Sequence, residues 1–191
     1  MSSPYRIPSN AELMFSGIRS QIFQWDQDMY DGSVRRFETI RFLDAAFVLP
    51  ILPNGDILLT RQEQPGRTQF ISLPGGSFDF PEEDPRICAM RELREETGYK
   101  TDSLVDWMEF HGTSNVFTEV HYYIARDCVL VGDMMPDGGE KIELFTVSFD
   151  ELIELSSDRR FHHHWNLLPI FYEARLDPVK KESLKKILYE M

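Results

Sequence analysis

A glycine turn that leads directly into a glutamate-rich segment is the feature that most constrains how this chain can fold. Residues 74–83 contain two adjacent glycines, and residues 91–99 contain glutamates spaced three and four positions apart. Helix residues at those spacings share a face, so Glu92, Glu95 and Glu96 should present their carboxylates on one stripe. Two carboxylates about 4 Å apart repel by roughly 4 kcal/mol at an effective dielectric of about 20, so a sheltered cluster needs a cation or must keep a proton.

The sequence also marks both ends of this helix. Asp84 is a suitable N-cap, Pro85 suits the first helical position, and Gly98 suits the left-handed residue that ends a helix. We therefore predict a helix between Asp84 and Gly98.

The acids of this helix have a simpler interpretation, in which they are solvated and partly paired with Arg91 and Arg94. At about 100° per residue, however, the apolar residues form an arc, and Glu92 and Glu96 lie at its edge rather than opposite it. Acids at the rim of a buried face border a cleft. Hard, all-oxygen ligands of this kind favour Mg²⁺ or Mn²⁺.

The same segment resembles the signature of the Nudix hydrolases, G-x5-E-x7-R-E-U-x-E-E-x-G-U, where U is an aliphatic or aromatic residue. The chain departs from it at one point, because six residues separate Gly76 from Glu83 where the family has five. Either the loop carries one extra residue, or Glu82 takes the place of the acid. The positions that match the second half of the signature are Arg91, Glu92, Leu93, Glu95, Glu96, Gly98 and Tyr99.

The resemblance implies a site for the hydrolysis of a diphosphate, a reaction that needs neutralised phosphoryl oxygens and an activated water. Glu92 and Glu96 are the metal ligands that it implies most strongly, with Glu95 and the backbone carbonyl of Gly75 as further ligands. Mg²⁺ is the expected ion, and Mn²⁺ is the alternative.

Other residues of the motif are expected to support this site. Gly76 should let the main chain approach the metal and the substrate, and Gly98 should end the helix. Arg91 is expected to pair with Glu83 and to brace the loop, although a plain helix salt bridge of little consequence is the alternative. By resemblance, Arg91 and Glu96 are therefore expected among the catalytic residues.

In the ADP-ribose pyrophosphatase branch of the family, the general base usually lies on a mobile loop late in the domain. Glu140, within residues 137–144, occupies the matching place. A solvated loop acid is the alternative interpretation of Glu140, and Glu119 is a second candidate. Many members of that branch have a Ser-Pro-Gly element after the motif, whereas residues 113–117 read Thr-Ser-Asn-Val-Phe.

The order of predicted elements is that of an α/β protein. Strand-like runs flank the central helix, residues 116–131 are expected to form one strand, and amphipathic helices are expected over residues 165–175 and 180–189. We predict an α/β/α sandwich with a mixed sheet, as in Nudix proteins. Residues 1–43 should form an N-terminal β appendage and residues 44–191 the Nudix domain.

Beyond the motif, the order of elements resembles the ADP-ribose pyrophosphatase branch over most of the chain. In that branch the appendage commonly helps to build a homodimer, and one of its aromatic side chains can stack on adenine. Phe23, Trp25 and Tyr30 are the candidates here, and a simple core role is the alternative. Arg61 is placed to meet a phosphate or to form a surface ion pair, and Glu119 is a further candidate substrate contact.

Composition and charge exclude several classes of function. The formal net charge is −12, which disfavours a nucleic-acid partner because affinity for phosphate backbones needs clustered Lys and Arg. No apolar run is long enough to cross a bilayer, and residues 1–6 lack the apolar stretch of a secretory signal. We therefore expect a cytoplasmic protein without a membrane partner that binds a small nucleotide.

Two further residue types invite a metal or redox interpretation and do not support one. Cys88 and Cys128 lack metal or redox spacing and suit small core side chains. The three consecutive histidines at residues 162–164 point in different directions on a helix or a strand, which favours a surface or capping role over chelation.

Taken together, the residues and the resemblance predict a Mg²⁺-dependent enzyme that splits ADP-ribose or another nucleotide sugar into a nucleoside monophosphate and a sugar phosphate. A nucleoside triphosphate pyrophosphohydrolase of the pool-sanitising type is one alternative. A catalytically silent nucleotide-binding module is the other, although such a module would not need the full set of acids.

Overall fold

The computed structural model describes residues 7–80, 82–112, 115–162 and 164–190. Residues 1–6, which bear on the expectation about a secretory signal, lie outside the described residues, as do residues 113–114 and His163. Within the described part of the chain, no helix is long and apolar enough to cross a membrane.

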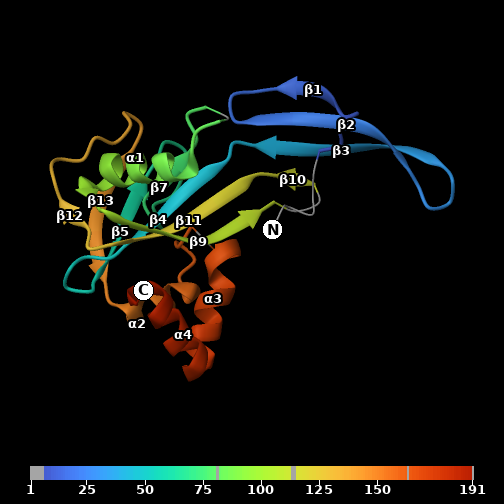
Figure 1. Cartoon of the computed structure of the whole chain (residues 1–191). Coiled ribbons are helices and arrows are strands. Elements are labelled where there is room, and N and C mark those ends of the chain that lie inside the picture. Colours follow the sequence, from blue (N-terminus) through green and yellow to red (C-terminus); the bar gives the residue numbers. More distant parts are fainter. Residues whose placement is uncertain (1–6, 81, 113–114, 163, 191) are drawn as a thin grey trace.

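The described residues form four β-sheets, one helix in the middle of the chain and a group of helices at its C-terminal end (Figure 1). The strands are β1 (Glu12–Ser16), β2 (Ser20–Asp28), β3 (Val34–Phe42), β4 (Ala45–Pro50), β5 (Ile57–Glu63), β6 (Phe70–Ser72), β7 (Gly75–Ser77), β8 (Tyr99–Lys100), β9 (Ser103–His111), β10 (Val116–Phe117), β11 (Glu119–Arg126), β12 (Val129–Leu130) and β13 (Lys141–Val147). The helices are α1 (Pro85–Thr97), α2 (Phe149–Glu154), η1 (Leu155–Ser157, a 3-10 turn), α3 (His164–Leu176) and α4 (Pro178–Tyr189).

The central sheet has the strand order β7-β4-β11-β9 and is mixed, since β11 runs parallel to β4 and antiparallel to β9. A second sheet has the order β13-β5-β6 with antiparallel pairing throughout. The appendage forms a third sheet in the order β1-β2-β3-β10, and β12 pairs with β8.

Successive residues of β4 face two separate apolar cores. Val48 packs in the core under α1, which also contains the buried side chains of Cys88 and Cys128, as expected of core side chains. Leu49 packs in the core that α2, α3 and α4 cover, and β11 alternates between the two cores in the same way. Figure 1 shows α1 on one side of the sheet and the C-terminal helices on the other. The predicted α/β/α sandwich with a mixed sheet is confirmed.

Helix α1 begins and ends where the sequence predicts. The Asp84 side chain accepts a hydrogen bond of 2.8 Å from the backbone N–H of Arg86, and Pro85 is the first helical residue. Gly98 follows the helix with a φ of 77°. A Cβ at Gly98 would lie 2.2 Å from the carbonyl oxygen of Gly132, so both the backbone angle and the neighbouring loop require glycine.

The prediction of one strand over residues 116–131 is wrong. This segment is divided among three sheets, because β10 pairs with β3, β11 with β4 and β9, and β12 with β8. Asp127, with a φ of 52°, turns the chain between β11 and β12. Helix α4 also begins two residues earlier than expected, at Pro178, since Asp177 caps it through the backbone N–H of Val179.

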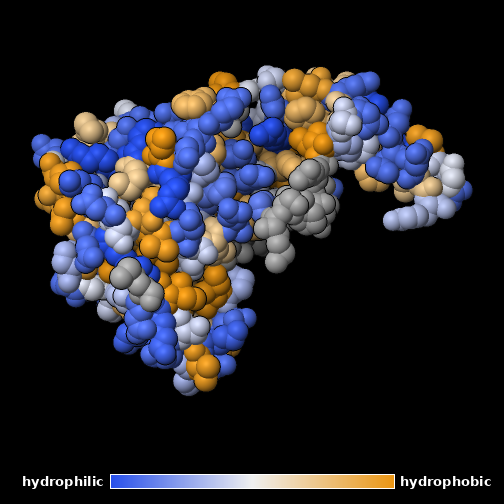
Figure 2. Space-filling view, in the orientation of Figure 1, coloured by the Kyte–Doolittle hydropathy of each residue, from blue (hydrophilic) through white to orange (hydrophobic). Residues whose placement is uncertain are grey.

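The hairpin of β2 and β3 projects from the body of the molecule in Figure 1, and β1 runs beside it. Figure 2 shows apolar side chains on this projecting part. Leu13, Phe15 and Ile18 are among the exposed ones, at 51%, 54% and 96%. The appendage boundary at residue 43 and the homodimer stay predictions.

Candidate active site

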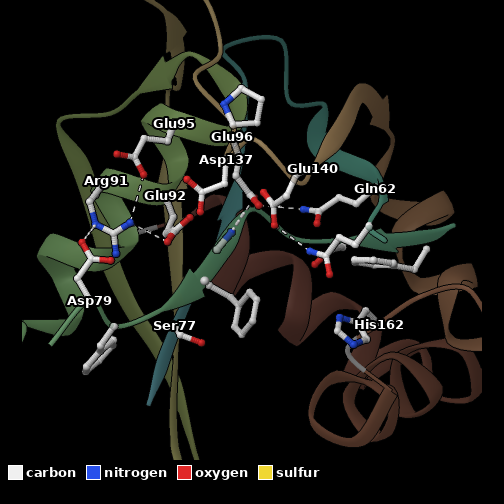
Figure 3. A pocket seen from close by; sticks show the side chains of 18 of the residues that line it. Gln62, Ser77, Asp79, Arg91, Glu92, Glu95, Glu96, Asp137, Glu140 and His162 are labelled. Atoms are coloured by element: carbon white, nitrogen blue, oxygen red, sulfur yellow. Dashed lines mark hydrogen bonds and ion pairs between the residues drawn. The ribbon is translucent and has the colours of Figure 1, made fainter. Parts of the chain in front are cut away.

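A polar cavity of about 420 Å³ lies where the glycine turn of β7, one face of α1, the loop before β13 and the loop between β5 and β6 meet. Figure 3 shows side chains from these elements turned toward one another. The lining residues with charged or amide side chains, or with an imidazole, are Arg19, Gln62, Gln64, Arg67, Asp79, Arg91, Glu92, Glu95, Glu96, Asp137, Glu140 and His162.

The three glutamates of α1 reach this cavity together, as their spacing predicts. Burial raises the pKa of Glu92 from an ordinary 4.5 to about 7, against the opposing effect of Arg91. Burial raises the pKa of Glu96 further, to about 8, and the charges of Glu92 and Glu140 add to this increase. The acids of the cavity therefore hold more negative charge than their surroundings stabilise.

Glu96 is held in place by donors from two neighbouring strands. The amide of Gln62 on β5 donates to Oε1 at 3.0 Å, and the backbone N–H of Gly75 on β7 donates to Oε2 at 3.0 Å. The glycine turn lies close against α1, because a Cβ at Gly76 would lie 2.4 Å from a carboxylate oxygen of Glu92. Glycine is therefore required at this position to let the backbone approach the acids.

Arg91 is surrounded by carboxylates from the loop and from its own helix. Its guanidinium lies 3.3 Å from Glu83, 2.8 Å from Glu92 and 3.2 Å from Glu95. Glu83 is buried and also accepts a hydrogen bond of 2.8 Å from the backbone N–H of Asp79. Of the two acids that the sequence left open, Glu83 meets Arg91, whereas Glu82 is exposed, so the loop carries one extra residue.

Glu140 is brought into the cavity from the loop before β13. Its Oε1 accepts a hydrogen bond of 2.8 Å from the Gln64 amide. The loop is tied to α1 upstream of Glu140, since the backbone N–H of Met135 donates to the Glu95 carbonyl at 2.7 Å and Arg94 donates to the Asp133 carbonyl at 2.9 Å. These contacts hold the loop beside the acids of the helix.

The structure places the other expected substrate contacts away from this cavity. Arg61 pairs with Glu143 at 2.8 Å and lies over the ring of Phe145, which is the surface ion pair considered above. Phe23 and Trp25 lie on β2, where the ring of Trp25 packs 6.0 Å from that of Phe37. Neither they nor Tyr30 line the cavity.

Glu119, the alternative base, also lies apart from the acids of α1. It stands at the start of β11, and its carboxylate is 3.9 Å from the ring of His111. Among the described residues that line the cavity, Glu140 is therefore the predicted base that the fold brings to the site.

Several lining residues carry no signal in the sequence. Gln62 lies on β5 and Gln64 directly follows that strand, and both face the cavity, but nothing in the sequence distinguishes them from other polar residues. Arg67 and His162 come from loops that are 95 residues apart in the chain. Of the histidine run, His162 lines the cavity, which the expected surface or capping role did not include.

The donor set fits a hard cation, because carboxylates crowded enough to raise one another's pKa are stabilised by a divalent ion. Within the described residues, no group of three or more Asp, Glu, His or Cys side chains already converges as a metal site. The reason is visible in the hydrogen bonds, since Glu92 and Glu95 turn toward Arg91 while Glu96 is held by Gln62. A bound ion would compete with these contacts.

Fold and site together define an α/β/α sandwich protein with an acidic cavity built on a glycine turn and one helix. A sequence model of the NUDIX domain matches residues 41–169. The chain belongs to the NUDIX domain family. The Nudix hydrolase class that the motif predicts is thereby confirmed.

Comparisons with individual proteins agree with this assignment. The chain is 26% identical over 165 residues to the methanol dehydrogenase activator of Bacillus methanolicus, covering 84% of this chain and 88% of the relative. It is 26% identical over 154 residues to the ADP-ribose pyrophosphatase of Bacillus subtilis (strain 168), covering 79% and 83%. The crystal structure of an ADP compounds hydrolase superposes with a TM-score of 0.71 at 20% identity, covering 92% of this chain and 97% of that one, which shows a shared fold. The resemblance to ADP-ribose pyrophosphatases is confirmed.

Proposed function

We propose that this protein is a Mg²⁺-dependent hydrolase that cleaves the pyrophosphate of ADP-ribose or of another nucleotide sugar, giving a nucleoside monophosphate and a sugar phosphate. The observation that carries the proposal is the meeting of Glu92, Glu95, Glu96 and Glu140 in one cavity beside the glycine turn. Such a set of acids repels a phosphate unless a cation stands between them.

In this proposal, Glu92 and Glu96 hold the ion, with Glu95 and the backbone carbonyl of Gly75 as further ligands. An ion held there would neutralise the phosphoryl oxygens and would make the attacking water more acidic. Mn²⁺ has the same preference for oxygen ligands and is the alternative ion.

The protein's own groups supply the remaining steps. Glu140 takes a proton from the attacking water, whose oxygen forms a bond to one phosphorus while the bridging oxygen leaves with the other phosphate. Arg91 braces the glycine loop through Glu83 and keeps the helix acids oriented.

The names of the two relatives point in different directions. One names a substrate, ADP-ribose, and the other names an effect on a dehydrogenase. The acid set of the cavity favours the hydrolase, because a protein that only contacts a partner does not need one buried and two partly buried carboxylates on one helix face. We further propose a cytoplasmic homodimer, for which the exposed apolar side chains of the appendage are the supporting observation.

Product analysis tests the substrate. Purified protein is incubated with ADP-ribose, other nucleotide sugars, dinucleoside polyphosphates and nucleoside triphosphates, with Mg²⁺ or with EDTA, and the products are separated by chromatography. We expect Mg²⁺-dependent release of a nucleoside monophosphate from ADP-ribose or another nucleotide sugar. Preference for a triphosphate with release of pyrophosphate would establish the pool-sanitising alternative, and binding without any hydrolysis would establish the silent module.

A further inference from the structure

Arg67 lines the acidic cavity, and within the described part of the chain its guanidinium forms no ion pair with a carboxylate. The guanidinium contacts the Gln64 amide oxygen at 3.2 Å, Nε2 of His162 at 2.9 Å and the ring of Phe70, whose centroid lies 4.9 Å from the guanidinium carbon. Among the described residues, none of its partners is an acid. Arg91, at the other end of the same cavity, contacts four carboxylates, those of Asp79, Glu83, Glu92 and Glu95.

The surroundings hold the guanidinium in place without using all of its donors. A guanidinium has five N–H donors, and the contacts to Gln64 and His162 use two of them. Phe70 supports its face by a cation–π contact. With respect to the described residues, three donors therefore remain for a ligand, and a fork of guanidinium donors matches the oxygens of a phosphate.

Backbone hydrogen bonds hold the main chain of His162 next to β6, and a ring contact supports its side chain beside Arg67. The backbone N–H of His162 donates to the Ile71 carbonyl at 2.8 Å, and that of Ile71 donates to the Arg160 carbonyl at 2.8 Å. The ring of His162 packs 4.8 Å from that of Phe70. Because a guanidinium only donates, Nε2 of His162 accepts from it and helps to orient it.

Gln64 separates this cation from the proposed base. Its amide nitrogen donates to Glu140 at 2.8 Å, while its amide oxygen accepts from Arg67 at 3.2 Å. The neutral amide of Gln64 therefore bridges the Arg67 guanidinium and the Glu140 carboxylate, in place of a direct ion pair between them. His162, which contacts Arg67, lies across the cavity from Arg91 and Glu95 in Figure 3.

We propose that Arg67, oriented by His162 and Phe70, is a phosphate-binding residue that holds the substrate phosphate lying away from the acids of α1. The inference rests on the proposed function for its substrate, since a pyrophosphate presents two adjacent phosphates to the cavity. Arg67 then binds one phosphate, and the other lies beside the carboxylates that would hold the ion.

Binding of phosphate-containing fragments tests this subsite without any turnover. The probes are adenosine monophosphate, ribose 5-phosphate and the uncharged nucleoside adenosine, titrated by calorimetry in EDTA. For Arg67→Gln we expect affinity for at least one phosphate probe to fall by about tenfold or more, which is the size of a charge-assisted hydrogen bond, while any binding of adenosine is unchanged. Arg35→Gln is the matched control, because Arg35 is exposed on β3 and does not line the cavity.

Two results would overturn the subsite. One is an affinity of Arg67→Gln for both phosphate probes within twofold of the native value, and the other is a native protein that binds neither probe. The Michaelis constant (KM) of Arg67→Gln for the best substrate shows whether the subsite or the proposed function has failed. Hydrolysis with an unchanged KM in Arg67→Gln refutes the subsite alone, whereas phosphate binding that depends on Arg67 in a protein that hydrolyses no pyrophosphate refutes the proposed function alone.

Discussion

Glu96 combines burial, negative charge and few compensating donors. It is 5% exposed, and its two hydrogen bonds come from Gln62 and the backbone of Gly75, both neutral groups. A buried carboxylate without a cation is costly, which is why burial raises its pKa to about 8. The side chain is therefore positioned at the expense of stability.

Replacing Glu96 by Gln removes that charge while keeping the shape of the side chain. We expect turnover to fall by about 100-fold or more, because a metal ligand contributes several kcal/mol to the transition state, with the unfolding temperature unchanged or slightly higher. Turnover at saturating Mg²⁺ and thermal unfolding measure both effects. Glu82→Gln is the matched control, since it removes an exposed charge next to the same loop. A folded Glu96→Gln protein with native turnover would rule out the metal assignment.

The site residues that the sequence predicts are those whose relation is local. Glu92 and Glu96 share a helix face by their spacing alone, and Arg91 carries over from the motif. Arg67 and His162 were missed because their contact depends on how β6 pairs with the segment before α3. Arg61 is the opposite case. Its position in the sequence suggests a phosphate contact, but its side chain pairs with Glu143 on the neighbouring strand β13.

At the scale of elements, α1 was predictable and the strands around it were less so. Its cap, proline and terminal glycine each act within a few residues, so no tertiary information is needed. The division of residues 116–131 among three sheets depends on partners far away in the chain, such as β3 for β10. Short strands of two or three residues, including β7 and β8, have no periodicity for a sequence pattern to reveal.

Glu140 lies in the loop before β13, and replacing it by Gln distinguishes a general base from a metal ligand. We expect Glu140→Gln to lower turnover by about 10²-fold or more with little change in the Mg²⁺ titration midpoint, because a general base acts on water and does not hold the ion. Activity titrated with Mg²⁺ measures both quantities, and Glu92→Gln provides the comparison for a ligand. A midpoint shift as large as that of Glu92→Gln would make Glu140 a ligand, and unchanged turnover would favour Glu119 as the base.

At the scale of the whole molecule, the acids of the cavity link folding to pH. The folded pKa values of Glu92 and Glu96 are raised from 4.5 to about 7 and about 8. Between pH 4.5 and 8 the folded state therefore binds more protons than the unfolded state, so their contribution to stability is full below pH 4.5 and is lost as the pH rises through 7 and 8.

We expect the unfolding temperature in EDTA to decrease more steeply from pH 5 to pH 8 for the native protein than for Glu96→Gln. Mg²⁺ should raise the unfolding temperature, and most strongly at pH 8, since a ligand that binds only the folded state stabilises it. Differential scanning calorimetry at several pH values measures this. Identical pH slopes for the two proteins would contradict the link between Glu96 and stability.

The pairing of β10 with β3 joins the projecting hairpin to a distant part of the chain. Val116 lies opposite Ile40 in that parallel pair, so a segment after β9 completes the sheet of the appendage. On a ribosome, this fourth strand becomes available only after the glycine turn and α1 have been synthesised. The β2–β3 hairpin can form early from local contacts, but its sheet is completed late, at the cost of closing a long loop.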